Sequence, residues 1–235
     1  MSSPGAGIKA LLFDLDGTLY RQRPLRLRMV ASLATLPLEL RSLREAQGTW
    51  GAIQSFRRVR ESLRSLGDGC ATLAQEQYTR AAQVAKTSPD ELERIVVEWL
   101  HERPLRHLRR YRQPGAIELL DRLSAAGIRA GVFSDYPAVA KLEALGLGDR
   151  FDPILAATDE SIHAFKPHPA GLLEACRIWG LSPSEVLYVG DRPEVDAAAA
   201  TAAGMRCAII GASRTGSTST YRRIDRLEEL VDVIG

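Results

Sequence analysis

Short, strongly apolar segments recur along this chain and predict the strands of a sheet. They cover residues 8–13, 128–133, 153–156, 186–189 and 205–210. The first is apolar at nearly every position, which is typical of a strand whose two faces are both covered. The segments therefore predict buried strands.

Helical patterns separate these segments. The first helix begins at Pro114-Gly115, and the others cover residues 137–145, 170–179 and 195–203. A glycine stands where each helix is expected to stop, as is common just past a helix end: Gly127, Gly146, Gly180 and Gly204. Strands that alternate with helices predict an α/β fold, in which a Rossmann-like, doubly wound parallel sheet has helices on both faces. Near the end of the chain we expect a surface loop over residues 213–220 and a last helix over residues 224–233.

Residues 21–112 interrupt this alternation, because they contain helical patterns and no convincing strand. The clearest helix begins at Ser88-Pro89-Asp90-Glu91, where a cap residue, a proline at the first helical position and a glutamate form a capping box. Pro37 and residues 67–69 indicate helix breaks. We therefore expect an all-helical domain at residues 21–112, inserted into a catalytic core made of residues 1–20 and 113–235.

The inserted segment contains two tryptophans, Trp50 and Trp99. Trp99 repeats at helical spacing with Leu92, Ile95 and Val96, which indicates one buried helix face. We interpret both tryptophans as core residues of the insert rather than as platforms for a substrate.

The composition is that of an ordinary globular protein. Of the 235 residues, 45% are hydrophobic and 26% are charged, and the net charge is only +2. Residues 1–5 lack the basic and apolar regions of a signal peptide, and no apolar run approaches the ~18 residues of a membrane span. Three cysteines, Cys70, Cys176 and Cys207, are far apart, so we expect no disulfide framework or zinc site and interpret them as thiols in a reducing cytoplasm.

The charges are distributed unevenly along the chain. Residues 21–112 carry 18 basic and 10 acidic side chains, whereas the rest of the chain carries 13 basic and 19 acidic ones. This asymmetry suggests two units with different roles. The basic surplus of the insert has two interpretations, either solvated helix faces or a surface that meets an anionic site.

Polar and charged residues follow the first four predicted strands, at the edge where a parallel sheet binds its ligands. In chain order they are Asp14 and Asp16, then Ser134 and Asp135, then Lys166, then Asp191 and Asp196. Four of them, Asp14, Asp16, Asp191 and Asp196, are carboxylates with only Lys166 to offset their charge. Carboxylates that crowd together raise one another's pKa unless a cation intervenes. A hard divalent ion resolves the conflict, most simply Mg²⁺, which commonly shares its ligands with a substrate phosphate.

These residues resemble the four motifs of the haloacid dehalogenase-like hydrolase superfamily, and the resemblance extends over most of the chain. The run Asp14-Leu15-Asp16-Gly17-Thr18-Leu19 is similar to the first motif, Ser134 to the second, and Lys166-Pro167 to the third. Gly190-Asp191 followed by Asp196 is similar to the fourth. The organisation is closest to the phosphatase branch with a helical cap between the first two motifs, as in phosphoglycolate phosphatases.

The resemblance implies a role for each motif residue. Asp14 is expected to attack phosphorus and form an aspartyl-phosphate, and Asp16 to serve as general acid and base. Gly17 allows a tight turn beneath the phosphate. Substrate-binding roles are expected for Thr18, Ser134, Asp135 and Lys166, among which Ser134 and Lys166 hold phosphoryl oxygens. Metal binding is assigned to Asp14, Asp16 (through its backbone carbonyl), Asp191 and, in a supporting position, Asp196.

Two positions depart from the family pattern. Asparagine often follows the second-motif serine, and here the residue is Asp135. A carboxylate facing the site would repel phosphate, so we expect Asp135 to cap the helix that follows it. The residues between Asp191 and Asp196 lack the usual serine or asparagine, which leaves Glu194 as a competing metal ligand.

We therefore expect an Mg²⁺-dependent phosphatase that hydrolyses a small phosphate monoester. One alternative is a phosphomutase of the β-phosphoglucomutase type, which would need a sugar bisphosphate, and another is a non-catalytic binding protein on the same fold. A dehalogenase is disfavoured because halide departure needs no proton donor such as Asp16. A phosphonatase is disfavoured because it needs a cap lysine, and the insert's only lysine is Lys86.

The expected partner is a small phosphorylated metabolite. Nucleic acid is not expected, because only the arginine-rich insert favours it and no docking motif is present. No membrane association is expected either, so we place the protein in the cytoplasm as a monomer or homodimer. Arg21, Arg23, Arg26 and Arg28 lie near the start of the insert, where one or two of them are candidates to meet a substrate carboxylate or second phosphate.

Overall fold

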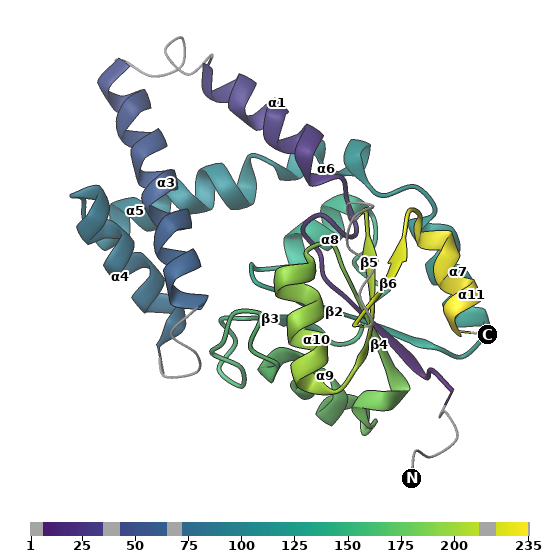
Figure 1. Cartoon of the computed structure of the whole chain (residues 1–235). Helices are drawn as coiled ribbons and strands as arrows, with labels where there is room; N and C mark the ends of the chain where they lie inside the picture. The colour runs from purple at the N-terminus through teal and green to yellow at the C-terminus, as the bar shows by residue number, and fades with distance from the viewer. Residues whose placement is uncertain (1–6, 35–42, 65–71, 212–219, 235) are drawn as a thin grey trace.

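A computed structural model describes residues 7–34, 43–64, 72–211 and 220–234, and its centre is a six-stranded sheet (Figure 1). The strands are β1 (Ala10–Phe13), β2 (Arg129–Ser134), β3 (Ile154–Ala156), β4 (Val186–Gly190), β5 (Arg206–Ile210) and β6 (Arg222–Ile224). Their spatial order is β3-β2-β1-β4-β5-β6, and every neighbouring pair is parallel. The prediction of a Rossmann-like parallel sheet is confirmed.

The five predicted strands are present with ends that shift by at most two residues, whereas β6 was missed. The prediction of one helix over residues 224–233 is wrong at its start. Residues Arg222–Ile224 pair with β5, and only then do a short 3₁₀ turn (Leu227–Leu230) and helix α11 (Val231–Ile234) follow. A strand of three residues with only Ile224 buried is too short to show an alternating pattern, so its pairing at the sheet edge decides its structure.

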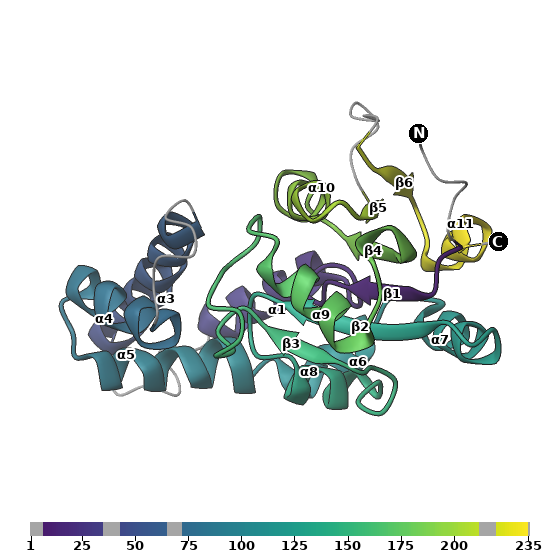
Figure 2. The same cartoon turned by 90° about the horizontal axis from the view of Figure 1, so that it is seen from below.

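Helices cover both faces of the sheet (Figures 1 and 2). Helices α7 (Ala116–Ala125) and α8 (Val139–Leu145) share a buried cluster with Leu11 and Phe13 of β1. Helices α9 (Ala170–Trp179) and α10 (Ala198–Ala203) share the other cluster with Ala10 and Leu12. Alternate residues of the central strand β1 therefore pack into two separate cores, one on each face, as a doubly wound sheet requires. The predicted helix at 195–203 begins instead with a π turn over Pro193–Ala197 and continues as α10.

In the described part of residues 21–112, every regular element is a helix or a helical turn. It contains α1 (Gln22–Ala34), α3 (Leu43–Arg64), α4 (Leu73–Ala85), α5 (Pro89–Val96), a π turn (Val97–Glu102) and α6 (Leu105–Tyr111). The expected breaks at Pro37 and residues 67–69, like most of the 213–220 loop and Cys70, lie outside the described residues. Figure 2 shows α3, α4 and α5 gathered at one side of the molecule, away from the sheet.

Helix α5 starts at the predicted capping sequence, but the capping box is only half formed. The Ser88 hydroxyl accepts a hydrogen bond from the Glu91 backbone N–H at 3.2 Å. The Glu91 carboxylate binds the Arg94 guanidinium at 2.7 Å, one turn along the helix. The cap therefore comes from serine and proline, and the glutamate stabilises the helix through an i,i+3 ion pair.

Two connections between the helical segment and the sheet run side by side. The Arg21 N–H donates to the Tyr111 carbonyl at 2.8 Å, and the Gln113 N–H donates to the Leu19 carbonyl at 2.9 Å. We propose that the boundary between a core (1–20, 113–235) and an inserted domain (21–112) lies at this pair of connections. The helices next to it still pack on the core, because Leu25 of α1 and Leu108 of α6 belong to the same buried cluster as Leu142 of α8.

Within the described ranges, no helix is long and apolar enough to cross a bilayer. Cys176 and Cys207 are buried and form no disulfide. Both sit in the cluster beneath α9 and α10, where they pack as small apolar side chains.

Candidate active site

The carboxyl ends of the three adjacent strands β2, β1 and β4 bring the predicted site residues together. Asp14 directly follows β1, Ser134 ends β2, and Asp191 directly follows β4. The Asp14 N–H donates to the Val189 carbonyl at 2.8 Å, so pairing with β4 continues one residue past β1. In an open α/β sheet this edge is where ligands bind.

Lys166 is the central cation of the site and is only 2% exposed. Its ammonium nitrogen lies 2.5 Å from Asp14 Oδ1, 2.8 Å from Asp196 Oδ1 and 2.9 Å from the Tyr188 hydroxyl oxygen. Burial acts to lower the pKa of Lys166, but Asp14 and Asp196 outweigh burial and hold it well above the usual value. Lys166 therefore stays charged next to Asp14.

Asp14 lies among like charges. Its Oδ2 accepts a hydrogen bond from the Thr18 hydroxyl at 3.2 Å, while its Oδ1 faces Lys166. Burial raises the pKa of Asp14 well above its usual value, and although Lys166 opposes this, the neighbouring carboxylates of Asp196, Asp191 and Asp16 add to it. The cluster thus carries more negative charge than one lysine offsets.

Asp196 fixes the loop that carries Asp191. Its Oδ2 accepts from the backbone N–H groups of Asp191 (3.1 Å) and Arg192 (2.9 Å), and its Oδ1 accepts from Lys166 and Tyr188. A side chain at Gly190 would lie only 2.4 Å from the Asp196 carboxyl carbon, so this close approach requires glycine. Both oxygens already have protein partners, which suits a supporting position. Glu194 instead binds Arg192 at 3.0 Å and lies outside this carboxylate cluster.

The arrangement fits a hard divalent cation. One carboxylate oxygen from each of Asp14, Asp191 and Asp196 lies within 4.8 Å of the others. Gly17, at a φ of +109°, brings the backbone so close to Asp191 that an added Cβ would lie 2.1 Å from Asp191 Oδ2. Burial, and then Asp196, raises the pKa of Asp191 to about 7. Crowded oxygen donors with raised pKa values are the donor set that Mg²⁺ accepts.

The Asp16 side chain points away from this cluster, toward Lys141 of α8. Lys141 Nζ lies 2.7 and 2.8 Å from the two Asp16 carboxylate oxygens, and the Tyr20 hydroxyl donates to Oδ1. Burial acts to raise the pKa of Asp16, but Lys141 and Tyr20 outweigh burial and lower it. Lys141 was not predicted as a site residue. The available signal was a lysine on the apolar face of its helix, beside Leu142 and Leu145.

The prediction that Asp135 caps the following helix is wrong. Helix α8 begins at Val139 without any side-chain cap. The Asp135 carboxylate instead binds Arg64 of α3 at 2.7 Å and accepts from the Lys166 backbone N–H at 3.2 Å. Burial acts to raise its pKa, but Lys166, Arg64 and Arg60 hold it below the usual value. A distant helix therefore supplies the partner that the local sequence did not reveal.

Two arginines of α3 join the second-motif and third-motif loops. Arg64 also donates to the Lys166 carbonyl at 2.6 Å, and Arg60 donates to the Asp135 carbonyl at 2.6 Å. The Arg60 guanidinium lies between the rings of Tyr136 and Phe165, 3.9 and 4.2 Å from their centroids. Next to these contacts, the buried Ser134 hydroxyl accepts from the Tyr136 N–H at 3.1 Å. Helix α3 therefore contacts both loops that carry predicted phosphate-binding residues.

Replacing Arg64 with alanine is expected to reduce the free energy of unfolding by about 1–3 kcal/mol, because the nearly buried Asp135 carboxylate would lose its guanidinium partner and keep, among the described residues, only the Lys166 backbone N–H as a hydrogen-bond donor. The two side chains are 12% and 11% exposed, so solvent screens their contact only in part. Urea denaturation measures the change, with Arg58→Ala on the exposed face of the same helix as the control. The double variant Arg64→Ala/Asp135→Ala should lose less free energy of unfolding than the sum of the losses in the two single variants. Losses that simply add would contradict a direct interaction between the two side chains.

Comparisons with known proteins agree with this geometry. A model of the haloacid dehalogenase-like hydrolase family matches residues 8–204. The phosphoglycolate phosphatase of Rhodospirillum rubrum is 32% identical over 207 residues, which cover 84% of this chain and 77% of the relative. The glyceraldehyde 3-phosphate phosphatase of Methanopyrus kandleri is 28% identical over 241 residues, or 97% of each chain.

A solved structure gives the same result for the fold. The crystal structure of 2-haloacid dehalogenase from Pseudomonas syringae pv. tomato is 26% identical and superposes with a TM-score of 0.66, covering 96% of this chain and 97% of that one. The family match spans the first strand through α10 and includes every site residue described above. The chain belongs to the haloacid dehalogenase-like hydrolase family.

Proposed function

We propose that this protein is a phosphatase that hydrolyses a small phosphate monoester through an aspartyl-phosphate on Asp14. The observation that carries the proposal is the contact between Asp14 and the buried Lys166 ammonium, 2.5 Å apart, at a strand end that also holds Thr18 and Asp191. A nucleophilic carboxylate beside a fixed cation suits an anionic phosphoryl group. The relatives named for phosphoglycolate and glyceraldehyde 3-phosphate support a small substrate.

In the first half of the proposed reaction, an Asp14 carboxylate oxygen bonds to phosphorus while the bond from phosphorus to the alcohol oxygen breaks. Because Lys141 and Tyr20 keep its pKa low, Asp16 takes up a proton as the anionic substrate binds and gives that proton to the departing oxygen. In the second half, Asp16 takes a proton from water, the water oxygen bonds to phosphorus, and the bond to Asp14 breaks to release inorganic phosphate. Lys166, Ser134 and Thr18 hold the phosphoryl group, while Asp135 fixes the loops of Ser134 and Lys166.

A Mg²⁺ ion held by Asp14, Asp191 and the Asp16 carbonyl would offset the negative charge of the carboxylates and the phosphoryl group. Asp196 would support this set by holding the Asp191 loop. The proposed inserted domain, residues 21–112, would act as a helical cap over the phosphoryl group, because Arg60 and Arg64 of α3 contact the loops beside it.

A panel of phosphorylated metabolites tests the proposal, with free phosphate measured in the presence and absence of Mg²⁺. Release of phosphate that requires Mg²⁺ is the expected result. Product isomerisation of a sugar phosphate, with little free phosphate, would favour the phosphomutase alternative. Absence of turnover across a broad panel would favour a non-catalytic binding protein.

Similarity to a 2-haloacid dehalogenase makes carbon–halogen cleavage the second candidate activity. Asp16, bound by Lys141 and Tyr20 beside Asp14, favours phosphoryl transfer because a halide leaves without a proton. Incubation with 2-haloacids and measurement of free halide separates the two activities. Halide release at a rate comparable to phosphate release would overturn the preference.

Replacing Lys141 with methionine should move the acidic limb of the pH–rate profile to higher pH. Lys141 lowers the pKa of Asp16, and without it burial raises that pKa, so Asp16 accepts a proton from water only at a higher pH. Activity should therefore fall most on the acidic side of the profile. The profile of kcat/KM measures the shift, and a profile that keeps its position would show that Lys141 does not act through Asp16.

A further inference from the structure

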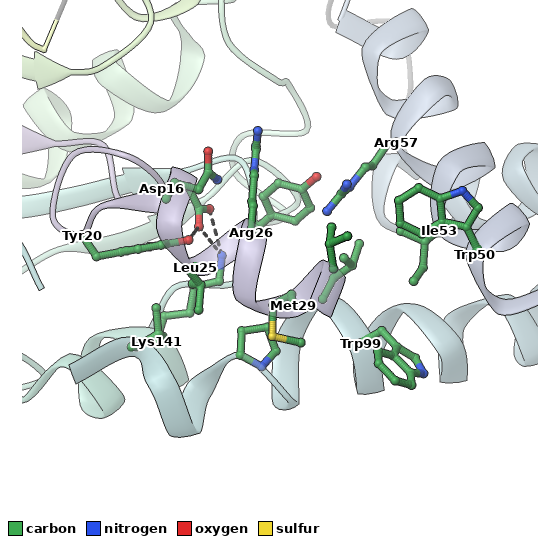
Figure 3. Close-up of a pocket in the computed structure, with 16 residues that line it drawn as sticks. Asp16, Tyr20, Leu25, Arg26, Met29, Trp50, Ile53, Arg57, Trp99 and Lys141 are labelled. Atoms are coloured by element: carbon green, nitrogen blue, oxygen red, sulfur yellow. Dashed lines mark hydrogen bonds and ion pairs between the residues drawn. The ribbon is translucent and has the colours of Figure 1, made fainter. Parts of the chain in front are cut away.

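A pocket opens beside Asp16, between the core and the helical segment (Figure 3). Helices α1 and α3 and the Val97–Glu102 turn form most of its wall, and Tyr136 and Lys141 close it on the core side. Its volume of about 120 Å³ is many times the ~10–15 Å³ that one water molecule needs. An organic group therefore fits next to the carboxylate that is proposed to protonate the leaving alcohol.

The end of the pocket far from Asp16 is apolar. Trp50, Ile53 and Trp99 lie there, and Met29 and Leu25 continue the apolar wall toward Asp16 (Figure 3). The interpretation of Trp99 as a core residue is confirmed, since the residue is 5% exposed, but for Trp50 it is wrong, because that residue is 42% exposed. A large aromatic ring that is exposed beside a pocket next to the reaction centre is typical of a ligand contact.

Two arginines line the pocket, Arg26 from α1 and Arg57 from α3, and Figure 3 shows Arg57 extending from α3 toward the side of the pocket that holds Asp16. Both also line the adjoining recess that contains Asp14, Lys166 and Asp191. Among the described residues neither has a hydrogen bond or an ion pair. Two neighbouring guanidinium groups without a counter-ion favour the binding of an anion, and guanidinium binds carboxylate or phosphate through paired hydrogen bonds.

We propose that the substrate is a phosphate monoester whose alcohol has an aromatic or similarly apolar body and carries a second anionic group, such as a carboxylate. This inference rests on the proposed phosphatase function. The phosphoryl group lies at Asp14 and Lys166, the second anion meets Arg26 and Arg57, and the apolar body packs against Trp50 and Ile53. Phosphoglycolate, the substrate in the name of one relative, has the carboxylate but no apolar body to fill the pocket.

Three alkyl phosphate monoesters test the apolar body and the second anionic group of the substrate separately. The phosphate ester of phenyllactate has both, phosphoglycolate has only the carboxylate, and 2-phenylethyl phosphate has only the apolar body. With Mg²⁺ present, kcat/KM for the first should exceed that for each of the others by at least ~10-fold, since a filled apolar site and a paired charge each contribute at least this much. Phosphate release without this ranking would overturn the inference and leave the phosphatase function standing. No phosphate release from these three or from a broad panel would remove the function itself.

Substitutions test which residues bind the second anionic group and which bind the apolar body. Arg57→Gln should reduce the preference for phenyllactate phosphate over 2-phenylethyl phosphate by at least ~10-fold, and Arg26→Gln should act in the same direction. Trp50→Ala should reduce the preference for phenyllactate phosphate over phosphoglycolate by a similar factor. Arg58→Gln, on the exposed side of α3 and outside both recesses, is the matched control and should keep both ratios. If the arginine variants slow all three substrates equally, the arginines act on the transferred phosphoryl group and the inference is wrong.

Discussion

Asp14→Asn is expected to reduce phosphate release by at least ~10³, as for the loss of a covalent nucleophile. Asparagine has nearly the same shape, and its single carbonyl oxygen can still accept from Thr18 or from Lys166, so the change removes the proposed nucleophile with little change in packing. Because burial and three neighbouring carboxylates raise the pKa of Asp14, the neutral side chain should also relieve repulsion in the cluster. Single-turnover phosphate release measures the rate, and thermal denaturation shows that the variant is folded.

Asp149→Asn is a suitable control, since this carboxylate is 88% exposed and lines neither the recess that contains Asp14 nor the pocket beside Asp16. Its activity should equal that of the unmodified protein. A single turnover in ¹⁸O-labelled water adds an independent check, because water attacks phosphorus in the proposed second step. The label should appear in phosphate and not in Asp14. Full activity of Asp14→Asn, or incorporation of ¹⁸O into Asp14, would contradict the proposed aspartyl-phosphate mechanism.

The parts of the fold that the sequence predicted are those in which local pattern and tertiary environment agree. Strands β1, β4 and β5 are buried on both faces, so they appear as continuous apolar runs. Helix α9 ends at Gly180, which adopts the left-handed conformation that glycine favours there. Strand β6 lacks such a pattern because it lies at the sheet edge and owes its conformation to pairing with β5.

The same distinction holds for the site. The positions of Asp14, Ser134 and Asp191 were predictable because parallel strands place their carboxyl ends at one edge of the sheet, independently of how the helices pack. Lys141, Arg60 and Arg64 were not, because their positions depend on how α8 and α3 pack against that edge. Asp135 illustrates the consequence, since a local rule suggested a helix cap and a helix 71 residues earlier in the chain supplied an arginine instead.

The charges of the site fall into two groups with different partners. Asp135 and Asp16 each have a cation from a helix, Arg64 and Lys141, and the pKa of each is lowered. Asp14 and Asp191 lie with Asp196 around Lys166, and burial and neighbouring carboxylates raise the pKa of each, although Lys166 opposes this at both and Arg192 at Asp191. The protein thus offsets the charge of Asp135, which contacts the loops, and of Asp16, the proposed proton donor. It leaves negative charge where the proposed cation would bind.

Removing Mg²⁺ with EDTA is therefore expected to abolish phosphate release, and adding it back should stabilise the fold. The folded-state pKa of Asp191 is about 7, above the usual aspartate value of 3.8, so between these pH values the native state holds a proton that the unfolded state has lost. The metal-free protein should lose stability as pH rises toward 7. Mg²⁺ needs ionised ligands, so its stabilising effect should be larger at pH 8 than at pH 6.

Thermal denaturation with and without Mg²⁺ at these two pH values measures the effect. At an Mg²⁺ concentration of about 100 times Kd, stabilisation of about 2.7 kcal/mol corresponds to a rise in Tm of roughly 5–10 °C for a chain of this size. Asp191→Asn should remove most of this rise, whereas Asp149→Asn should keep it. An equal rise in Asp191→Asn would place the ion elsewhere. Activity that persists in EDTA would show that Lys166 alone offsets the charge of the phosphoryl group, and the crowding of Asp14, Asp191 and Asp196 would then need another cause.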